Sequence, residues 1–445
     1  MKLSTSYRQI LSLSVPIMLG SAAQNIIVLS DNVFLYHYST IDFAAAGLVG
    51  VFYLIIASIG YGFSRGGQII IARRNGEHNY TGAGTDFQAL FLFEFLLSLI
   101  LFCFLYFWSR DFFELFIKNP EILEKCMEYI KPRSFGVFFS YLGVSLIAFY
   151  TGIANTRFII YDTLVLIIVN IVLNYFLVFG AFGLEPMGIA GSALASTLAE
   201  VVAFIVFIVY MIWDKTNRKY GLLSIHRLKY SSFANMFSIS FPIVFQSILG
   251  IGSWFLFFSF IENVGSKELE ISNLLRTIYL ILSIPCWGYS AGINTIVSNF
   301  IGNKKRQAVL PLIIKTTKIN LLSTMLISLP VLMFPEFFLY PLFGRDDMTL
   351  ILESKPYMMM LFAILMIFGT GGIFINGLIG TGHTRTALRI QTIFTIVYII
   401  YSYLMIKHWY FGLNWAWAAE IFYWGGITIM SLLYLKTNKW HFLKF

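Results

Sequence analysis

The sequence predicts an all-α polytopic membrane protein, because three features of its 445 residues agree. Hydrophobic residues make up 58% of the chain and charged residues 12%, with a mean hydropathy of +0.77. Soluble domains contain about 25% charged residues. Apolar runs of about 20 residues, long enough to cross a bilayer as helices, recur along the whole chain. The second half of the chain also repeats the first.

We expect twelve transmembrane helices, six in each half of the chain. Their predicted positions are 10–36, 44–70, 86–108, 134–152, 158–180, 187–213, 237–261, 271–300, 309–334, 355–378, 386–407 and 414–435. An even number of spans per half means that both halves insert in the same direction. This arrangement is a parallel internal repeat of the kind found in some transporters.

The internal repeat is seen in identical residues at matching positions of the two halves. One constant shift in numbering superposes Ser12–Pro16 on Ser238–Pro242, Tyr53 on Tyr279, Gly62 on Gly288 and Gly76 on Gly302. We therefore expect two six-helix lobes. The N-lobe is assigned to residues 1–213, a cytoplasmic linker to 214–236 and the C-lobe to 237–445.

Basic residues predict the orientation of the chain in the membrane. With a cytoplasmic N-terminus, 18 of the 31 Lys and Arg residues fall in inner segments and 9 in outer segments, as the positive-inside rule requires. Topology therefore explains the net charge of +9 better than a nucleic-acid partner does. We expect a bacterial inner-membrane protein with both termini cytoplasmic. Residues 110–133 should lie outside, with Pro120 opening a short amphipathic helix at the outer surface.

Two residues of the first predicted span, Pro16 and Asp31, do not suit hydrocarbon. A proline removes a helix hydrogen bond, and an ionised aspartate in the membrane costs at least about 2.5 kcal/mol unless it faces protein or water. Gln24 lies seven residues before Asp31, close to two helical turns, so both share one face. The repeat places Phe257 opposite Asp31. We expect Asp31 and Gln24 to line a cavity of the first half and to form part of a cation-coupling site.

Further polar residues occur in the fifth and sixth predicted spans. Asn170 and Asn174 are spaced i, i+4, which places both amides on one helix face. We assign them to the cation-coupling site with Asp31, although such amides also bond neighbouring helices in packed bundles. Thr197 and Glu200 of the sixth span are assigned to a substrate cavity.

The second half is rich in aromatic residues. Trp254, Trp287 and Glu420 are assigned to the substrate cavity, since aromatic walls suit apolar or cationic ligands. Most of the other rings are expected to face lipid or the helix core. Glu200 and Glu420 each follow an alanine in the sixth span of their half. An intramembrane carboxylate is a functional candidate, but this pattern also fits a structural role inherited by duplication.

The sequence lacks the residue patterns of an enzyme. None of the six histidines pairs at metal-ligand spacing, and no nucleophile motif occurs. Residues 380–385 resemble a phosphate-binding loop only superficially, because the following GK[ST] is missing. We therefore expect no enzymatic activity, no cofactor, no resident metal and no ATP-driven pump.

Several of these residues occur in a recognisable order: Pro16, Gln24 and Asp31, the turns at Gly76 and Gly302, Asn170 with Asn174, Gly188–Gly191, Pro242, and Gly380–Arg385. In this order they resemble the multidrug and toxic compound extrusion (MATE) family over essentially the whole chain. The resemblance implies two six-helix lobes that alternately expose a central cavity. It also implies export of organic cations or other amphipathic compounds against an inward flow of protons or sodium.

The chain also departs from the pattern of the NorM-like branch, which carries carboxylates in the seventh and tenth spans. Gly250 and Phe368 occupy those positions here. The DinF-like branch pairs the aspartate of the first span with one in the fifth span, where this chain has Asn174. The resemblance is therefore closer to the DinF-like branch, and it favours protons over sodium as the coupling ion.

We consequently expect a monomeric secondary active antiporter in which Asp31 couples proton flow to export, with sodium as the alternative ion. Its partners are an amphipathic small molecule, the coupling ion and the lipid bilayer. The alternative function is a flippase for a lipid-linked oligosaccharide or lipid precursor. Such flippases of the same superfamily commonly have fourteen spans and a more basic cavity.

Overall fold

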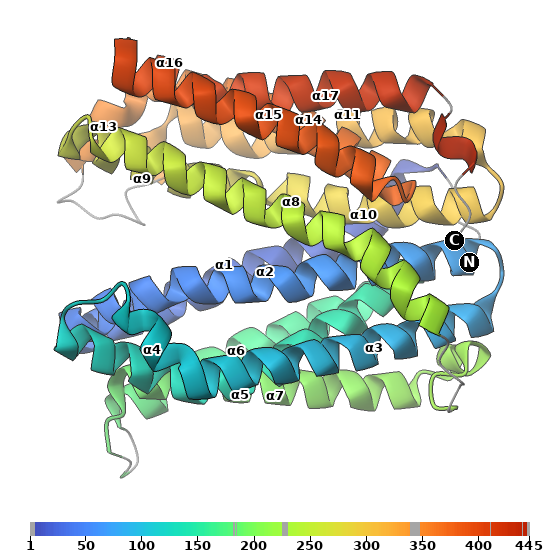
Figure 1. The fold of residues 1–445 in the computed structure, drawn as a ribbon, viewed down its shortest axis with the longest axis horizontal. Coiled ribbons are helices and arrows are strands. Elements are labelled where there is room, and N and C mark those ends of the chain that lie inside the picture. The colour runs from blue at the N-terminus through green and yellow to red at the C-terminus, as the bar shows by residue number, and fades with distance from the viewer. Residues whose placement is uncertain are drawn as a thin grey trace. The chain divides into compact units, whose positions relative to one another are not determined.

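The computed structural model describes residues 5–180, 183, 185–224, 230–338, 348–409, 411–437 and 439–442, apart from the side chains of residues 21, 23–25, 348 and 441–442. Every regular element in this part of the chain is a helix (Figure 1). The prediction of an all-α protein is therefore confirmed.

The chain divides into two compact units. The N unit comprises residues 19–244, and the C unit comprises residues 1–18 together with residues 245–445. Helices of the N unit are the second part of α1 (Tyr7–Tyr38), α2 (Thr40–Gly76), α3 (Tyr80–Cys103), α4 (Ser109–Glu114), α5 (Pro120–Gly152), α6 (Arg157–Phe179), α7 (Gly188–Trp213) and the first part of α8 (Tyr230–Glu262). Within this unit α5 packs against α2, α3 and α7, and α7 packs against α6.

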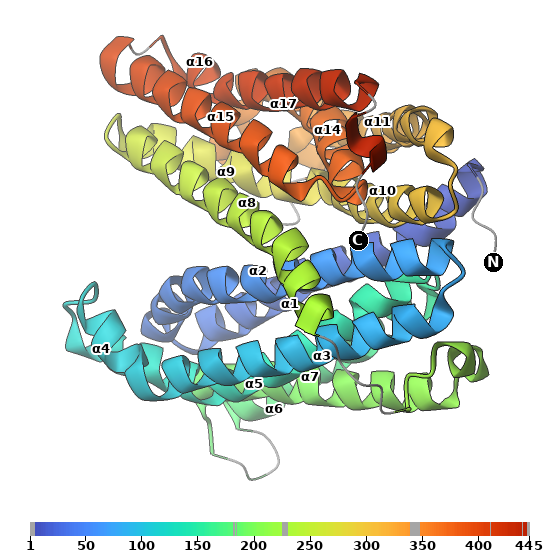
Figure 2. The ribbon, with the colours of Figure 1, turned by 45° about the vertical axis from the view of Figure 1, so that its right-hand side comes forward.

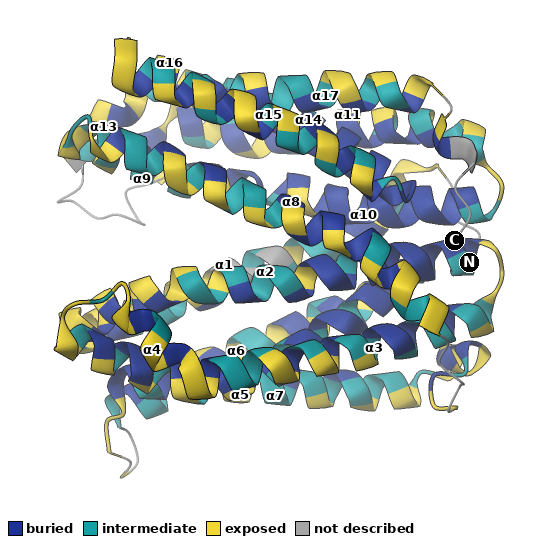
Figure 3. Ribbon diagram, in the orientation of Figure 1, coloured by how far each residue is buried: buried dark blue, intermediate teal, exposed yellow. Residues whose placement is uncertain are grey.

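The C unit is built from the remaining helices. They are the first part of α1, the second part of α8, α9 (Ser266–Leu282), α10 (Ile284–Gly302), α11 (Val309–Met333), α13 (Met348–Ser354), α14 (Met358–Gly380), α15 (Thr384–Tyr403), α16 (Leu413–Trp417) and α17 (Ala419–Lys436). Here α14 packs against α10, α11 and α17. Figures 1 and 2 both show α15 beside α17. Helix α10 is buried along nearly its whole length (Figure 3).

Ten helices are long and apolar enough to cross a membrane, and the bent pair of α9 and α10 adds an eleventh span. This count covers the described residues. Helix α1, which contains side chains outside the description, is not among these helices. A multi-pass membrane protein is therefore supported, whereas twelve spans remain a prediction.

Helices α1 and α8 each contribute to both units, and each passes from one unit to the other two residues after a proline. The divisions follow Met18 and Val244, after Pro16 and Pro242. The segments before these divisions pack into glycine-lined sockets. A Cβ atom added at Gly66 would overlap Ser240 of α8, and one added at Gly292 would overlap Ser14 of α1. The internal repeat, which superposes Pro16 on Pro242, relates these two contacts to each other.

The eighth predicted span, 271–300, is not one straight helix. The structure ends α9 at Leu282 and starts α10 at Ile284, with a bend of 44°. Pro285 explains the break, because it lacks the N–H that would continue the helical ladder. The repeat places Ile59 at the corresponding position of α2, and α2 is continuous.

The prediction that Pro120 opens a separate short helix is wrong. Pro120 does open a helix, and Asn119 Oδ1 accepts a 2.9 Å hydrogen bond from the Glu121 backbone N–H. Helix α5 then continues to Gly152 and accommodates Pro132 in its interior. Arg133 consequently lies in a helix and is only 8% exposed, although the sequence placed it in an outer segment.

Candidate functional site

The N unit brings Asp31 of α1 together with polar side chains of α6 and α7. Asp31 Oδ1 accepts hydrogen bonds from Asn174 Nδ2 at 2.6 Å and Asn170 Nδ2 at 3.2 Å. Its other carboxylate oxygen, Oδ2, accepts one from Ser196 Oγ at 2.9 Å. Asn170 Nδ2 also reaches Ser196 Oγ at 3.0 Å. The four side chains thus form one network, which we name the Asp31 cluster.

The helical spacing of the two asparagines explains why both reach one carboxylate. Residues four apart lie on the same face of a helix, and Asn174 Nδ2 also donates to the Asn170 carbonyl at 3.1 Å. Both asparagines are completely buried. Their amide oxygens have no hydrogen-bond partner within the described structure. The cluster therefore holds unused acceptors beside a carboxylate.

The groups that bond Asp31 are all electrically neutral. Among the described residues, Arg133 is the arginine that interacts electrostatically with Asp31. Its guanidinium forms hydrogen bonds with Glu200 and not with Asp31. Groups of three or more His, Cys, Asp or Glu side chains that could hold a metal do not occur among the described residues. The charge of Asp31 is thus stabilised by hydrogen bonds and not by a direct ion pair.

Glu200 of α7 forms a two-point ion pair with Arg133 of α5. Arg133 Nη1 donates to Glu200 Oε2 at 2.7 Å, and Nη2 donates to Oε1 at 2.6 Å. The Arg133 guanidinium also lies over the Tyr53 ring, 4.3 Å from its centroid. Gly136 leaves room for the pair, because an added Cβ would lie 2.5 Å from Arg133 Nη1.

The other residues assigned to the cavity of the first half lie as follows. Thr197 Oγ1 donates to the Pro132 carbonyl at 3.1 Å, which joins α7 to α5 beside the Arg133 and Glu200 ion pair. The side chain of Gln24 lies outside the described residues. The structure therefore brings Asn170 and Asn174 to Asp31, while Thr197 and Glu200 face α5.

A second buried carboxylate, Glu420 of α17, lies in the C unit. Its Oε1 accepts hydrogen bonds from Trp254 Nε1 of α8 at 2.7 Å and from Tyr398 Oη of α15 at 3.2 Å. Its Oε2 accepts one from Trp424 Nε1 at 3.0 Å. We name these four residues the Glu420 cluster. The cluster contains both Glu420 and Trp254, two residues that were predicted from the sequence to line one cavity.

Trp287, the third C-lobe residue assigned to the cavity, does not bond Glu420. Its Nε1 donates to Ser283 Oγ at 3.2 Å, and its ring centroid lies 5.8 Å from that of Phe368. The side chain is 42% exposed. Trp287 is therefore an accessible ring near the Glu420 cluster and not a part of its hydrogen-bond network.

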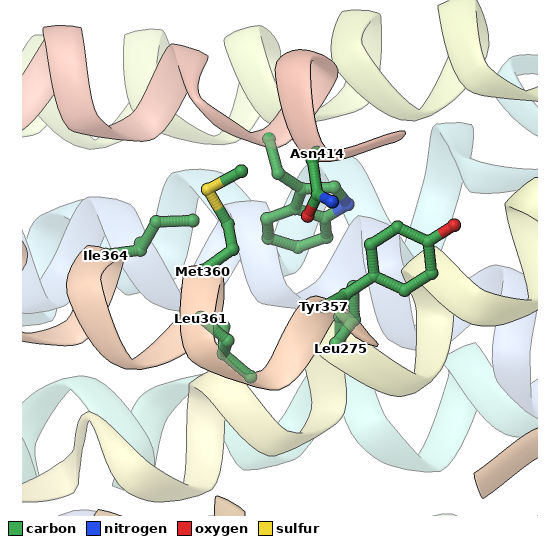
Figure 4. Close-up of a pocket in the computed structure, with 7 residues that line it drawn as sticks. Leu275, Tyr357, Met360, Leu361, Ile364 and Asn414 are labelled. Carbon is green, nitrogen blue, oxygen red and sulfur yellow. The ribbon is translucent and has the colours of Figure 1, made fainter. Parts of the chain in front are cut away.

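A small pocket of the C unit lies between α9, α14 and α16 (Figure 4). No charged side chain lines it; its residues are Leu275, Tyr357, Met360, Leu361, Ile364, Asn414 and Trp417. Matching Lys131-Pro132 to Lys355-Pro356 makes Tyr357 the counterpart of Arg133. The arginine that pairs with a carboxylate in the N unit thus has an uncharged counterpart in the C unit.

Four residues of these networks were not assigned to a site from the sequence: Ser196 of the Asp31 cluster, Tyr398 and Trp424 of the Glu420 cluster, and Arg133, the partner of Glu200. Ser196 and Tyr398 are common residue types in membrane helices, so composition gives no signal for them. Arg133 had a signal, because a buried arginine in an apolar helix needs an acidic partner. The predicted span began one residue too late to include it.

Many apolar helices and a buried carboxylate network between α1, α6 and α7 define a polytopic membrane protein with a candidate ion-binding site. The chain belongs to the MatE family of transporters, whose sequence profile matches residues 16–176 and 242–404. The family prediction is therefore confirmed.

Known relatives and solved structures agree with this assignment. The chain is 23% identical over 450 residues to "Probable multidrug resistance protein NorM" of Thermotoga maritima, covering 97% of this chain and 93% of that protein. It is 24% identical over 262 residues to "Multidrug resistance protein NorM" of Photobacterium profundum, with 58% of this chain and 57% of that protein covered.

Two solved structures share its fold. An outward-facing multidrug resistance MATE family transporter of the MOP superfamily superposes with a TM-score of 0.87 at 17% identity, covering 97% of this chain and 96% of that chain. A MOP superfamily transporter from Pyrococcus furiosus superposes with a TM-score of 0.84 at 17% identity, covering 97% and 95%.

Proposed function

We propose that this protein exports organic cations or other amphipathic compounds by proton-coupled antiport, with Asp31 as the coupling residue. The observation that carries the proposal is the Asp31 cluster, a carboxylate held by three neutral donors from α6 and α7. The names of the relatives from Thermotoga maritima and Photobacterium profundum, both multidrug resistance proteins, support the substrate class.

The Asp31 cluster can accommodate both charge states of its carboxyl group. Removal from water favours the neutral form of a carboxyl group over the charged form, so Asp31 can exchange a proton. The ionised form accepts the N–H groups of Asn170 and Asn174. After protonation the carboxyl O–H needs an acceptor, and Ser196 Oγ, which donates to the ionised form, can accept it because a hydroxyl both donates and accepts. The same side chain thus serves both forms.

Protons fit this geometry better than sodium does. A metal cation needs several oxygen ligands, whereas the groups that face Asp31 donate hydrogen bonds to it through two amide nitrogens and one hydroxyl. Gly250 and Phe368 stand where the NorM-like branch carries further carboxylates. This difference supports a place nearer to the DinF-like branch.

Protonation of Asp31 drives the cycle by changing the relative stability of two conformations. A ligand shifts such an equilibrium only by its difference in affinity for the two states. In this proposal two six-helix lobes, residues 1–213 and 237–445, joined by the cytoplasmic linker 214–236, expose the cavity alternately to the two sides of the bacterial inner membrane. One proton that crosses a potential of 100 mV contributes about 2.3 kcal/mol.

Transport in proteoliposomes tests the proposed function. The purified protein is reconstituted, and efflux of ethidium is followed under an imposed pH gradient, an imposed sodium gradient, or no gradient. We expect the pH gradient alone to raise efflux above that of the vesicles without a gradient. Efflux driven by sodium alone would refute proton coupling. Absence of ethidium transport together with scrambling of a lipid-linked sugar would favour the flippase alternative.

A further inference from the structure

We infer that Glu420 is a second proton-binding site of this chain, located in the C unit and separate from Asp31. A transport cycle then involves one proton at each carboxylate. The transport role of Glu420 rests on the proton-coupled export proposed above, whereas proton binding to Glu420 is tested independently of transport.

The first argument is the surroundings of the carboxylate. Glu420 is 2% exposed, and both of its oxygens are bonded by side chains of α8, α15 and α17. A buried carboxylate that lacks a cationic partner is costly unless hydrogen bonds or a bound cation stabilise it. Trp254 and Trp424 are themselves only half-buried, so the two indoles that bond the group are partly accessible.

The second argument is the absence of a positive charge among the described groups that face Glu420. The titratable groups around it are three tyrosines, Tyr279 of α9, Tyr398 of α15 and Tyr423 of α17. Helices α14 and α16 carry no titratable side chain. Helix α9 carries two cations: Lys267 pairs with Glu353 at 2.7 Å, and Arg276 lies over the Phe258 ring, 4.8 Å from its centroid.

The other basic side chains of the helices next to α17 lie farther along those helices. Arg385 and Arg389 belong to the first two turns of α15, at least nine residues before Tyr398. This setting differs from that of Glu200, whose charge is balanced by Arg133 at 2.6 Å. Arg133 thus neutralises Glu200, whereas no cationic side chain among the described residues pairs with Glu420.

The chemistry of the donors identifies the cation as a proton. Indole nitrogens donate hydrogen bonds and cannot act as ligands for a metal ion, and two of the three groups that bond Glu420 are indoles. The rings around the site pack against each other, with centroids of Phe368 and Trp424 4.7 Å apart. A proton needs no additional volume. Once Glu420 is protonated, Tyr398 Oη can accept its O–H, because a phenol both donates and accepts.

The internal repeat provides an independent argument. Gly188 and Gly412 are both glycines with positive φ at helix starts, and the alignment that superposes them also places Glu420 on Ser196 of the Asp31 cluster. The alignment that matches the turn at Gly152 to the turn at Gly380 places Tyr398 on Asn170. Two residues of the Glu420 cluster therefore correspond to two residues of the Asp31 cluster. The carboxylate lies on the first helix of the first half and on the last long helix of the second half.

Tryptophan fluorescence tests proton binding directly, because Trp254 and Trp424 bond the carboxylate. The emission of the purified wild-type protein is recorded across a pH titration in detergent. We expect a reversible transition that is lost in Glu420→Gln and retained in Asp31→Asn. Tyr423→Phe is the matched control: Tyr423 lies beside Tyr398, with ring centroids 5.6 Å apart, but it does not bond Glu420, so the transition should persist.

Two further variants keep the test decisive if Glu420→Gln does not fold. Glu420→Asp should keep a transition, and Tyr398→Phe should shift its midpoint by about one pH unit, since one hydrogen bond to the group is lost. An unchanged midpoint in Tyr398→Phe, or a wild-type transition in Glu420→Gln, would overturn the inference.

Transport measurements separate this inference from the proposed function. In proteoliposomes with a pH gradient, Glu420→Gln should lower ethidium efflux roughly tenfold, the loss expected when one protonation step is removed. If efflux by the wild-type protein did not respond to the pH gradient, the proposed function itself would be refuted. The tryptophan titration would still decide whether Glu420 binds a proton. Efflux at the wild-type rate in Glu420→Gln would overturn the role of Glu420 in transport.

Discussion

Arg133 and Glu200 bind each other through two parallel hydrogen bonds of 2.7 and 2.6 Å, and this pair joins α5 to α7 inside the N unit. The side chains are 10% and 17% exposed. Bidentate geometry and burial make this the strongest ionic contact that the described structure contains between these two helices. The Arg133 guanidinium thus bonds Glu200 and does not bond Asp31.

We predict that breaking this pair on one side is more harmful than removing it altogether. Arg133→Met leaves Glu200 buried without a partner and should cost about 3 to 5 kcal/mol of stability. The double variant Arg133→Met, Glu200→Leu removes both charges and should recover most of that loss. Thermal unfolding in detergent measures both effects. Equal destabilisation of the single and double variants would contradict the argument.

A second prediction concerns the glycine socket that holds the first part of α8. Gly66→Ala introduces a methyl group where Ser240 lies, and such overpacking costs about 1 to 3 kcal/mol. Gly50→Ala in the same helix is the control, because nothing lies within 4 Å of its added Cβ. Stability is again measured by thermal unfolding.

The double variant Gly66→Ala, Ser240→Gly should recover part of the stability that Gly66→Ala loses, because it removes the overlapping hydroxymethyl group of Ser240. Gly292→Ala should have a similar cost in the C unit, where Ser14 of α1 occupies the equivalent socket. If Gly66→Ala were as stable as Gly50→Ala, the socket would not be tightly packed.

Asn174 supplies the shortest hydrogen bond to Asp31, at 2.6 Å. We predict that Asn174→Leu lowers pH-driven ethidium efflux roughly 10-fold to 100-fold, because a hydrogen bond to a charged group contributes about 1.5 to 3 kcal/mol. Val172→Leu, at an exposed position of α6, is the control and should transport normally. Normal efflux by Asn174→Leu would remove Asn174 from the coupling site.

The predicted orientation can be tested by labelling single cysteines in intact cells. Lys118 and Lys215 are exposed and lie on opposite sides of the membrane in the predicted topology. An impermeant maleimide should label Lys118→Cys and should not label Lys215→Cys until the membrane is opened. The native cysteines Cys103, Cys126 and Cys286 are first replaced by serine. The reverse labelling pattern would invert the topology.

The sequence was sufficient for the helical fold and for the family, because both are recorded in patterns along the chain. Apolar runs of span length predict helices, and the i, i+4 spacing of Asn170 and Asn174 places two amides on one face. The structure is helical in these runs and brings both amides to Asp31. The roles proposed for these residues remain to be tested by the experiments above.

The sequence was not sufficient for contacts between distant helices. Arg133 and Glu200 are 67 residues apart, and no periodicity indicates that α5 and α7 bring them together. The helix that Pro120 opens was expected to be short, whereas α5 continues through Pro132 to Gly152. The bend at Ser283 similarly depends on one proline in an otherwise continuous apolar run.

The most direct test of the central claim compares wild type with Asp31→Asn in proteoliposomes, with two assays on the same vesicles. One assay measures ethidium efflux driven by a pH gradient, and the other measures exchange of ethidium for ethidium without a gradient. The account predicts that Asp31→Asn loses the driven efflux and keeps the exchange, because the cavity remains but the proton site is gone. Undiminished pH-driven efflux in Asp31→Asn would contradict the assignment of Asp31 as the coupling residue.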